Sequence, residues 1–213
     1  MDTLVGHGKI RYYGISNFSA WQAMKVMQVC EREGFTKPIS QQIHYTPQAR
    51  EAEYELMPMA HDAGLGTMIW SPLAGGLLSG KYRRDKDAPE GTRFSEGWQE
   101  PPIHDEKRLF ELIEPLVEVG DAHGVSAAQV ALAWITERPG VTTAVIGAGK
   151  AHQLEDNLAS AQLELSADEH AAIERVSRPQ LIYPYWHQAM NANDRFGAAD
   201  WVLHADHAED YQD

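Results

Sequence analysis

Short apolar segments alternate with segments of helical periodicity along much of the chain. Four runs rich in β-branched and aromatic residues predict buried strands, at 9–16, 38–45, 65–71 and 142–148. Apolar residues at spacings of three and four predict helices at 17–34, 49–64, 105–123, 126–138, 151–162 and 166–177. This alternation is typical of parallel β–α–β units with right-handed crossovers.

Local signals mark several ends of these helices. Ser126 is a natural N-cap, and Ser166 with Glu169 forms a capping box. Pro58 interrupts the pattern at 49–64. From residue 178 the chain turns aromatic and irregular and ends in an acidic tail. We therefore predict one α/β unit at 1–177 and an irregular C-terminal tail at 178–213.

Two architectures contain such units, the doubly wound sheet and the (β/α)₈ barrel. A doubly wound dinucleotide fold usually carries G-x-G-x-x-G after its first strand, and this chain lacks that fingerprint there. A barrel carries its functional groups at the carboxyl ends of successive strands. Polar, aromatic or glycine residues follow all four predicted strands here, which favours the barrel, although only four strands are predicted.

Composition narrows the classes of partner. The chain has 213 residues and a net charge of −13, which argues against a general nucleic-acid binder. We find no apolar run long enough for a membrane span and no signal peptide at the start, and the single Cys30 fits a reducing compartment, so we expect a cytoplasmic protein. His204 and His207 in the tail could bind a metal, but a solvated polar terminus is the simpler interpretation, and we predict no metal site.

Residues 75–81 read G-x-x-x-x-G-K, the opening of an ATPase phosphate loop. That loop requires Ser or Thr next, to hold Mg²⁺, and a helix directly after it. Tyr82 stands at the required position, and the residues that follow are polar and rich in Gly and Pro. The motif is therefore either a plain glycine turn or a phosphate loop of another kind.

Three segments carry a family resemblance: GKIRYYGISNFSAW (8–21), MIWSPLAGGLLSGKY (68–82) and VIGAGKAHQLEDNLAS (145–160). They occur in the order and at the spacing of the aldo-keto reductases, and the chain resembles most the branch with the potassium-channel β subunits and related bacterial reductases. The resemblance covers residues 2–177. It implies a (β/α)₈ barrel that binds NADP(H) without a Rossmann motif and reduces a small carbonyl substrate by hydride transfer.

The resemblance also implies which residues bind the cofactor. Ser16, Asn17 and Gln42 would bind the nicotinamide carboxamide, and Trp70 would stack on the nicotinamide ring, unless it is simply a core residue. The pyrophosphate loop would comprise Ser71, Pro72, Leu73, Gly75 and Lys81, with Arg93 as a second phosphate contact from a long loop closing over the cofactor. The adenosine end would comprise Gly147, Gly149, Lys150, Gln153, Asp156 and Asn157. Gly149 replaces a Ser or Arg that the family often has, so a preference for NADP(H) over NAD(H) depends on Lys150, which could equally be a solvated surface residue.

The family's catalytic Asp, Tyr, Lys and His come from its first four β/α units. This chain begins at what resembles the helix before the fifth strand, so the resemblance assigns it no catalytic residue. We expect a half barrel, either truncated or separately encoded, that is inactive alone and associates with itself through exposed sheet edges. The alternative is a non-catalytic cofactor-binding or interaction protein. Tyr183, Tyr185 and Trp186 either line a substrate pocket or pack beneath the barrel.

Overall fold

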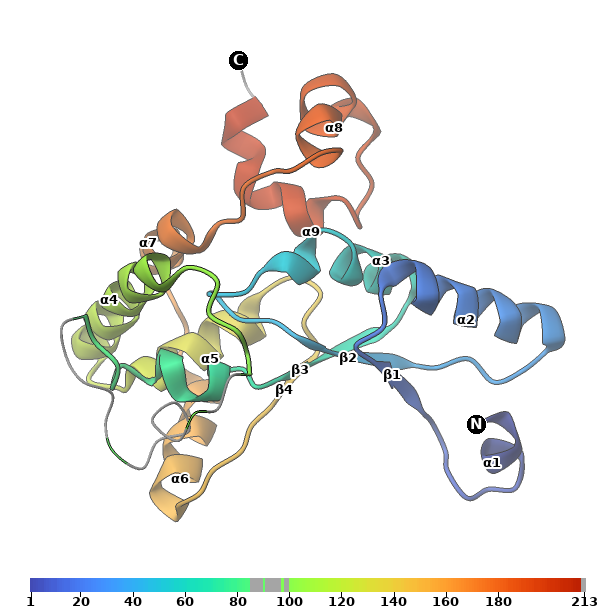
Figure 1. Cartoon of the computed structure of the whole chain (residues 1–213), viewed down its shortest axis with the longest axis horizontal. Helices are drawn as coiled ribbons and strands as arrows, with labels where there is room; N and C mark the ends of the chain where they lie inside the picture. The colour runs from blue at the N-terminus through green and yellow to red at the C-terminus, as the bar shows by residue number, and fades with distance from the viewer. Residues whose placement is uncertain (85–89, 91–96, 98–99, 212–213) are drawn as a thin grey trace.

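Four parallel strands form a single sheet at the centre of the molecule (Figure 1). The computed structural model describes residues 1–84, 90, 97 and 100–211. Within them, the strands are β1 (Gly14–Ser16), β2 (Ser40–His44), β3 (Gly66–Trp70) and β4 (Thr143–Val145). They lie in the order β1-β2-β3-β4, as consecutive strands of a barrel do, and each falls inside a predicted segment. The sheet is therefore consistent with part of a (β/α)₈ barrel.

Helices follow the strands. Their bounds are α1 (Asp2–Gly6), α2 (Ala20–Glu33), η1 (Glu51–Glu53), α3 (Leu56–Ala63), η2 (Ala74–Ser79), α4 (Glu106–His123), α5 (Ala127–Glu137), α6 (Ala151–Ala159), η3 (Ser160–Gln162), α7 (Ala167–Ser177), α8 (Tyr185–Asn191), η4 (Asn193–Arg195), α9 (Trp201–His204) and η5 (Ala205–Tyr211). The predicted caps are confirmed: Ser126 accepts from the Gln129 amide, and Ser166 and Glu169 form a capping box. The helix predicted at 49–64 is instead divided into η1 and α3, and Pro58 falls in the first turn of α3, where its missing N–H costs no helical bond.

The two faces of the sheet differ in burial. Gln41, Ile43, Thr67 and Ile69 are buried on one face, where Ile43 and Ile69 join the main core with residues of α4 and α5. The alternate residues of β2 and β3, on the other face, are only half-buried. Period-two alternation along each strand separates these faces. The half-buried face, together with the carboxyl ends of the strands, carries the candidate site.

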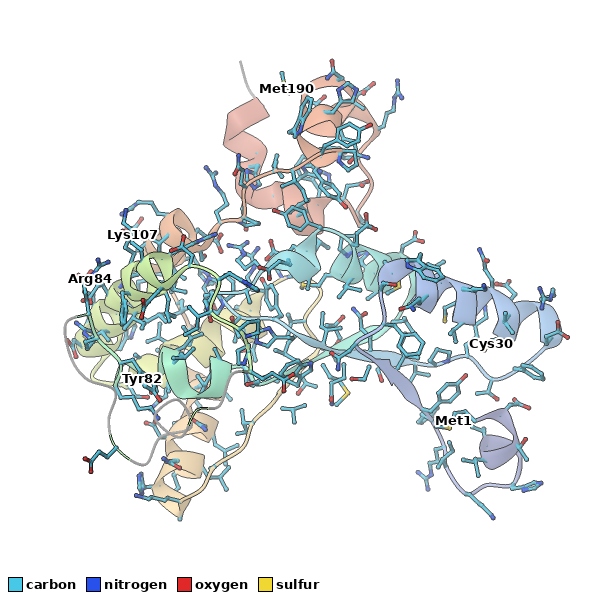
Figure 2. The ribbon with its side chains drawn as sticks, in the orientation of Figure 1. Met1, Cys30, Tyr82, Arg84, Lys107 and Met190 are labelled. Atoms are coloured by element: carbon cyan, nitrogen blue, oxygen red, sulfur yellow. The ribbon has the colours of Figure 1, made fainter. Side chains whose placement is uncertain are left out.

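The C-terminal segment, residues 178–211, was expected to be irregular, and this prediction is wrong. It forms α8, η4, α9 and η5 and stands beyond α3 and α7 (Figure 1). His204 and His207 were expected to be solvated but are buried; His204 is on α9, which packs against α3, and His207 is on η5. Met190, on α8, is 75% exposed at the outer end of this segment (Figure 2).

A buried cluster of charged side chains attaches the C-terminal segment to the rest of the molecule. Arg50 and Arg138 each contact the carboxylates of Glu53, Glu174 and Asp206. Both guanidinium groups also lie over the ring of Trp134, at 5.2 and 5.1 Å from its centroid. Residues from four separate parts of the chain therefore meet at one point.

Among the described residues, no helix is both long and apolar enough to cross a membrane. Within the same ranges, no group of three or more His, Cys, Asp and Glu residues is arranged to hold a metal ion.

Candidate functional site

A cavity of about 870 Å³ lies between the loop after β3 and the start of α6. It brings together two of the three segments that carry the family resemblance, although about 70 residues of chain separate them. The predicted site residues that line it are Ser71, Pro72, Leu73, Gly75, Lys81, Gly147, Gly149, Lys150, Gln153, Asp156 and Asn157. The tertiary structure thus forms a single cavity from the predicted pyrophosphate loop and the predicted adenosine end.

The loop after β3 has an unusual backbone. Ser71 and Ala74 have positive φ angles of 50°, and Gly75 and Gly76 continue with 67° and 100°. The Ser71 hydroxyl accepts a hydrogen bond from the Gly75 amide at 3.2 Å, which holds the turn together. The amides of Ala74, Gly76 and Leu78 also donate to carbonyls of the same loop, so the turn is closed by its own hydrogen bonds. The loop continues into the short η2, and Lys81 to Arg83 are irregular rather than helical, unlike an ATPase phosphate loop.

Lys81 is held directly above this loop. A Cβ placed on Gly76 would lie 3.1 Å from its ammonium nitrogen, and the φ of 100° at this position favours glycine. The ammonium also lies 5.1 Å from the ring centroid of Tyr82. Tyr82 is buried and therefore serves as a cation–π support, in the position where an ATPase has its Mg²⁺ ligand.

At the opposite wall, α6 presents Gln153, Asp156 and Asn157 on one face, as their spacing predicted. The amide of Gly149 donates to Oε1 of Gln153 at 3.1 Å, which fixes the turn that leads into the helix. Asn157 is buried, whereas Lys150, the N-cap residue of α6, is exposed at the rim of the cavity.

The carboxylate of Asp156 is engaged by α5. The Ser126 hydroxyl and the Gln129 side-chain amide each donate to it at 2.6 Å. Ser126 therefore has two roles, because it also caps α5. These bonds hold Asp156 in one orientation and offset its negative charge within the cavity. The remaining charged side chains of the lining, Lys81 and Lys150, are cationic, so the cavity suits an anionic ligand in a chain whose net charge is −13.

The predicted nicotinamide contacts form a second group, at the carboxyl ends of β1, β2 and β3. Ser16 pairs with Gln42 in the sheet, and its hydroxyl donates to the Gln42 carbonyl at 3.2 Å. Asn17, with φ of 55°, accepts a hydrogen bond from the Trp70 indole nitrogen at 2.9 Å. Trp70 is half-buried rather than part of the core, so one face of its ring can be covered by a ligand.

The predicted site residues therefore form two groups, one lining the cavity and one at the strand ends. Arg93 lies outside the described residues. Several residues of the cavity lining were not predicted: Gly76, Ser79, Ser126, Ala128, Val145, Ile146 and His152. Most of them adjoin predicted residues in sequence. Ser126, the N-cap of α5, and Ala128 come from a separate helix; Ser126 was predicted as a cap, but its contact with Asp156 was not predicted.

Tyr45 follows β2 directly but faces the core. Its ring is fully buried against Trp134, and its hydroxyl donates to Glu53 at 2.5 Å. Burial and the adjacent Glu53 raise the pKa of Tyr45 well above its usual range. His44, one residue earlier, is on the opposite face beside Trp70, as expected for neighbours on a strand. Tyr45 is therefore placed as a structural residue and not as a proton donor.

None of Tyr183, Tyr185 and Trp186 lines the cavity. Tyr185 donates to Glu55 at 2.5 Å, and Tyr183 is 72% exposed. Neither expectation for this aromatic group, a pocket lining or packing beneath the barrel, describes Tyr183.

Comparisons with known proteins all indicate the same family. The Aldo/keto reductase family model matches residues 1–178. An uncharacterised oxidoreductase YrpG of Bacillus subtilis is 34% identical over 167 residues, covering 78% of this chain and 49% of the relative. Versiconal hemiacetal acetate reductase of Aspergillus parasiticus is 30% identical over 186 residues, covering 86% and 53%. A probable voltage-gated potassium channel subunit beta of Oryza sativa subsp. japonica is 33% identical over 164 residues, covering 74% and 49%.

The chain spans about half the length of the curated relatives it matches. The matched region includes β1 to β4 and both walls of the cavity, so the similarity and the geometry concern the same residues. The chain belongs to the aldo/keto reductase family.

Proposed function

We propose that this chain binds NADP(H), with the nucleotide in the cavity and the nicotinamide at the strand ends, and that it serves carbonyl reduction by hydride transfer. The observation that carries the proposal is the single cavity that joins a loop of left-handed residues under Lys81 to the cationic rim at Lys150. Its volume of about 870 Å³ lies in the range of small-molecule and cofactor sites.

The residues present fit each part of such a cofactor. The ammonium of Lys81 and the hydroxyl of Ser71, which accepts from Gly75 and can still donate, would hold the diphosphate. The amide groups of Gln153 and Asn157 would contact the adenosine, with Asp156 fixed by α5. Lys150 supplies a charge for a 2′-phosphate, and this is the basis for proposing NADP(H) rather than NAD(H).

The strand ends would orient the nicotinamide. Asn17 and Gln42 offer both donors and acceptors, which a carboxamide requires, and Trp70 offers an aromatic face. The bound nicotinamide would supply the hydride. Delivery to a carbonyl also needs a proton donor at the oxygen, and Tyr45 is turned into the core. We therefore expect the chain alone to bind cofactor without turnover.

A second candidate is a cofactor-binding protein that acts through association. One observation favours it: β1 and β4 are both edge strands of the described sheet, and one face of that sheet is only half-buried. Exposed edges pair readily with other strands. We propose self-association through these edges, which is compatible with cofactor binding.

The cofactor proposal is tested by titrating NADPH and following tryptophan fluorescence and, independently, the heat of binding. Lys81→Met should weaken binding about 10- to 100-fold, because a hydrogen bond to a charged group contributes about 1.5–3 kcal/mol. Lys25→Met, on the exposed side of α2, is the matched control and should leave the affinity unchanged. Wild-type protein that shows no saturable response to NADPH or NADP⁺ up to millimolar concentration would contradict the proposal.

A further inference from the structure

His44 lies against Trp70 at the carboxyl end of the sheet. The two residues are direct partners in the register of β2 and β3, so their side chains lie on the same face. Their ring centroids are 4.8 Å apart with the planes tilted by 40°. Trp70 is also held by its indole nitrogen, which donates to Asn17. The indole is therefore fixed by one neighbour from β2 and another from the turn after β1.

A second, smaller cavity of about 140 Å³ backs His44. The buried Nε2 of His44 and the buried Oε1 of Gln48 both border it, and neither has a hydrogen-bond partner among the described residues. A polar cavity of this size has room for ordered water, which would satisfy both atoms. The imidazole thus has an aromatic ring on one side and a route for proton exchange on the other.

Several charged groups face this imidazole. Glu51, His104, Asp105 and Arg108 line the small cavity, and Glu100 also acts on His44 through its charge. Asp105 accepts from the Arg108 amide, and the Arg108 guanidinium donates to the carbonyls of Val176, Ser177 and Arg178. Burial lowers the pKa of His44, against the opposing effect of Glu51 and Glu100, so the imidazole is neutral at pH 7.

We propose that His44 is a positioning residue for the nicotinamide: it fixes Trp70 under the ring and, when protonated, selectively disfavours the oxidised cofactor. This inference rests on the proposed function. The nicotinamide of NADP⁺ carries a positive charge, and the nicotinamide of NADPH does not. A protonated imidazole in contact with Trp70 places a second positive charge behind the same aromatic stack. The oxidised cofactor is therefore bound less tightly in acid, where His44 becomes charged.

The test compares two ligands that differ only at the nicotinamide end. NADP⁺ carries the cationic ring, whereas 2′-phospho-ADP-ribose lacks it but keeps the diphosphate and the 2′-phosphate. Both affinities are measured by calorimetry at pH 8 and pH 5. Protonation of the phosphates affects both ligands alike and cancels in the ratio of the two affinities.

In the wild type, the affinity for NADP⁺ relative to 2′-phospho-ADP-ribose should fall about three- to tenfold between pH 8 and pH 5. This is the size expected for repulsion between the protonated imidazole and the cationic nicotinamide in a partly screened site. His44→Gln should remove this pH dependence, weaken NADP⁺ at pH 8 and leave 2′-phospho-ADP-ribose unchanged. His61→Gln, an exposed substitution on α3, should behave as the wild type.

The contact itself has a spectroscopic signature. Tryptophan fluorescence of the ligand-free protein should show an acid transition that is absent from both His44→Gln and Trp70→Phe. A pH-independent ratio in the wild type, or the same pH dependence in His44→Gln, would overturn the inference. Failure of both ligands to bind the wild type would instead overturn the proposed function on which it rests.

Discussion

At the residue scale, the two lysines of the cavity are both exposed but have different neighbours. The Lys81 ammonium lies over the ring of Tyr82 and beside Gly76, in the loop where we place the diphosphate. Lys150 precedes α6 on the other wall of the cavity, and its side chain does not cap that helix. A lysine in this position suits a group that distinguishes two related ligands, because its loss disturbs little else.

Lys150→Met should therefore reduce the preference for NADP⁺ over NAD⁺ rather than binding in general. We expect the affinity for NADP⁺ to fall about three- to tenfold, as for a single partly screened charge contact of about 1 kcal/mol, and the affinity for NAD⁺ to stay unchanged. Calorimetric titration with both ligands measures the ratio. If both affinities fall equally, Lys150 contacts a part that the two cofactors share; if neither falls, it is a solvated surface residue.

At the element scale, the start of α5 connects the core to the cavity. This helix is almost wholly buried, and Trp134 and Ile135 in it belong to the main core. Its N-cap, Ser126, accepts from Gln129 and donates to Asp156. The position of α6, and with it one wall of the cavity, therefore depends on a cap that the core helix needs for its own stability.

Ser126→Ala should affect both stability and binding. We expect a loss of about 1 kcal/mol in the free energy of unfolding, the usual value for an N-cap, together with weaker NADPH binding as Asp156 loses a donor. Ser166→Ala removes the N-cap of α7, which lies outside the cavity lining, and should cost similar stability without affecting the affinity. Urea unfolding and NADPH titration of both variants measure the two effects. Equal NADPH affinities in the two variants would show that the Ser126 cap does not contribute to binding.

At the scale of the whole molecule, the buried charged cluster determines where the C-terminal segment lies. Glu53 is the last residue of η1, and Arg50 directly precedes that helix. Arg138 directly follows α5, Glu174 is on α7 and Asp206 is on η5. Although burial opposes it, Arg138 and Arg50 hold the pKa of Asp206 well below its usual range, whereas burial raises the pKa of Glu174. The two carboxylates therefore act on stability in opposite directions as the pH changes.

Arg138→Met should release the C-terminal segment and destabilise the fold. Removing one partner from a buried ionic cluster typically costs about 3–5 kcal/mol. Because the folded-state pKa of Asp206 is depressed, its contribution is present above its unfolded pKa of about 3.9 and is lost as the pH falls through the folded value. The difference between variant and wild type should therefore be largest near neutral pH and shrink below about pH 4.

Urea unfolding at several pH values and limited proteolysis after residue 178 test this prediction. Arg32→Met is the control, because Arg32 is 71% exposed and contacts only the neighbouring Glu33 among the ion pairs that the structure describes. It should cost less than about 0.5 kcal/mol. A pH-independent difference, or a C-terminal segment that stays protected in Arg138→Met, would show that apolar packing of α9 rather than the cluster holds the segment.

The exposed edges of the sheet lead to a prediction about assembly. We expect the chain to form dimers or larger species, because β1 and β4 each present an edge without a partner strand among the described residues. Light scattering across a wide concentration range measures the mass. Tyr12→Lys places a charge beside β1, where Tyr12 is 67% exposed, and should shift the population toward the monomer. A wild-type monomer at every concentration would rule out this association.

The sequence by itself determined the features that depend on short stretches of chain. Short runs rich in β-branched and aromatic residues located all four strands, because this enrichment can be read from a few consecutive residues. Ser126 and Ser166 were identifiable as caps because each acts on an amide three residues away. The shared face of Gln153, Asp156 and Asn157 follows from their spacing, whereas their assignment to a site, and that of the glycine loop, came from the resemblance of short motifs to a family.

Tertiary structure alone decided which of these stretches meet. Asp156 accepts from Ser126 and Gln129, Arg50 and Arg138 share Glu174 and Asp206, and His44 lies against Trp70. Each of these contacts joins residues far apart in the chain. The C-terminal segment was mispredicted because its polar and acidic composition resembles a solvated tail. Its burial depends on two arginines more than 60 residues away. Local composition cannot encode such pairings, since their stability depends on charge attraction that offsets the cost of desolvation at a point that exists only once the chain has folded.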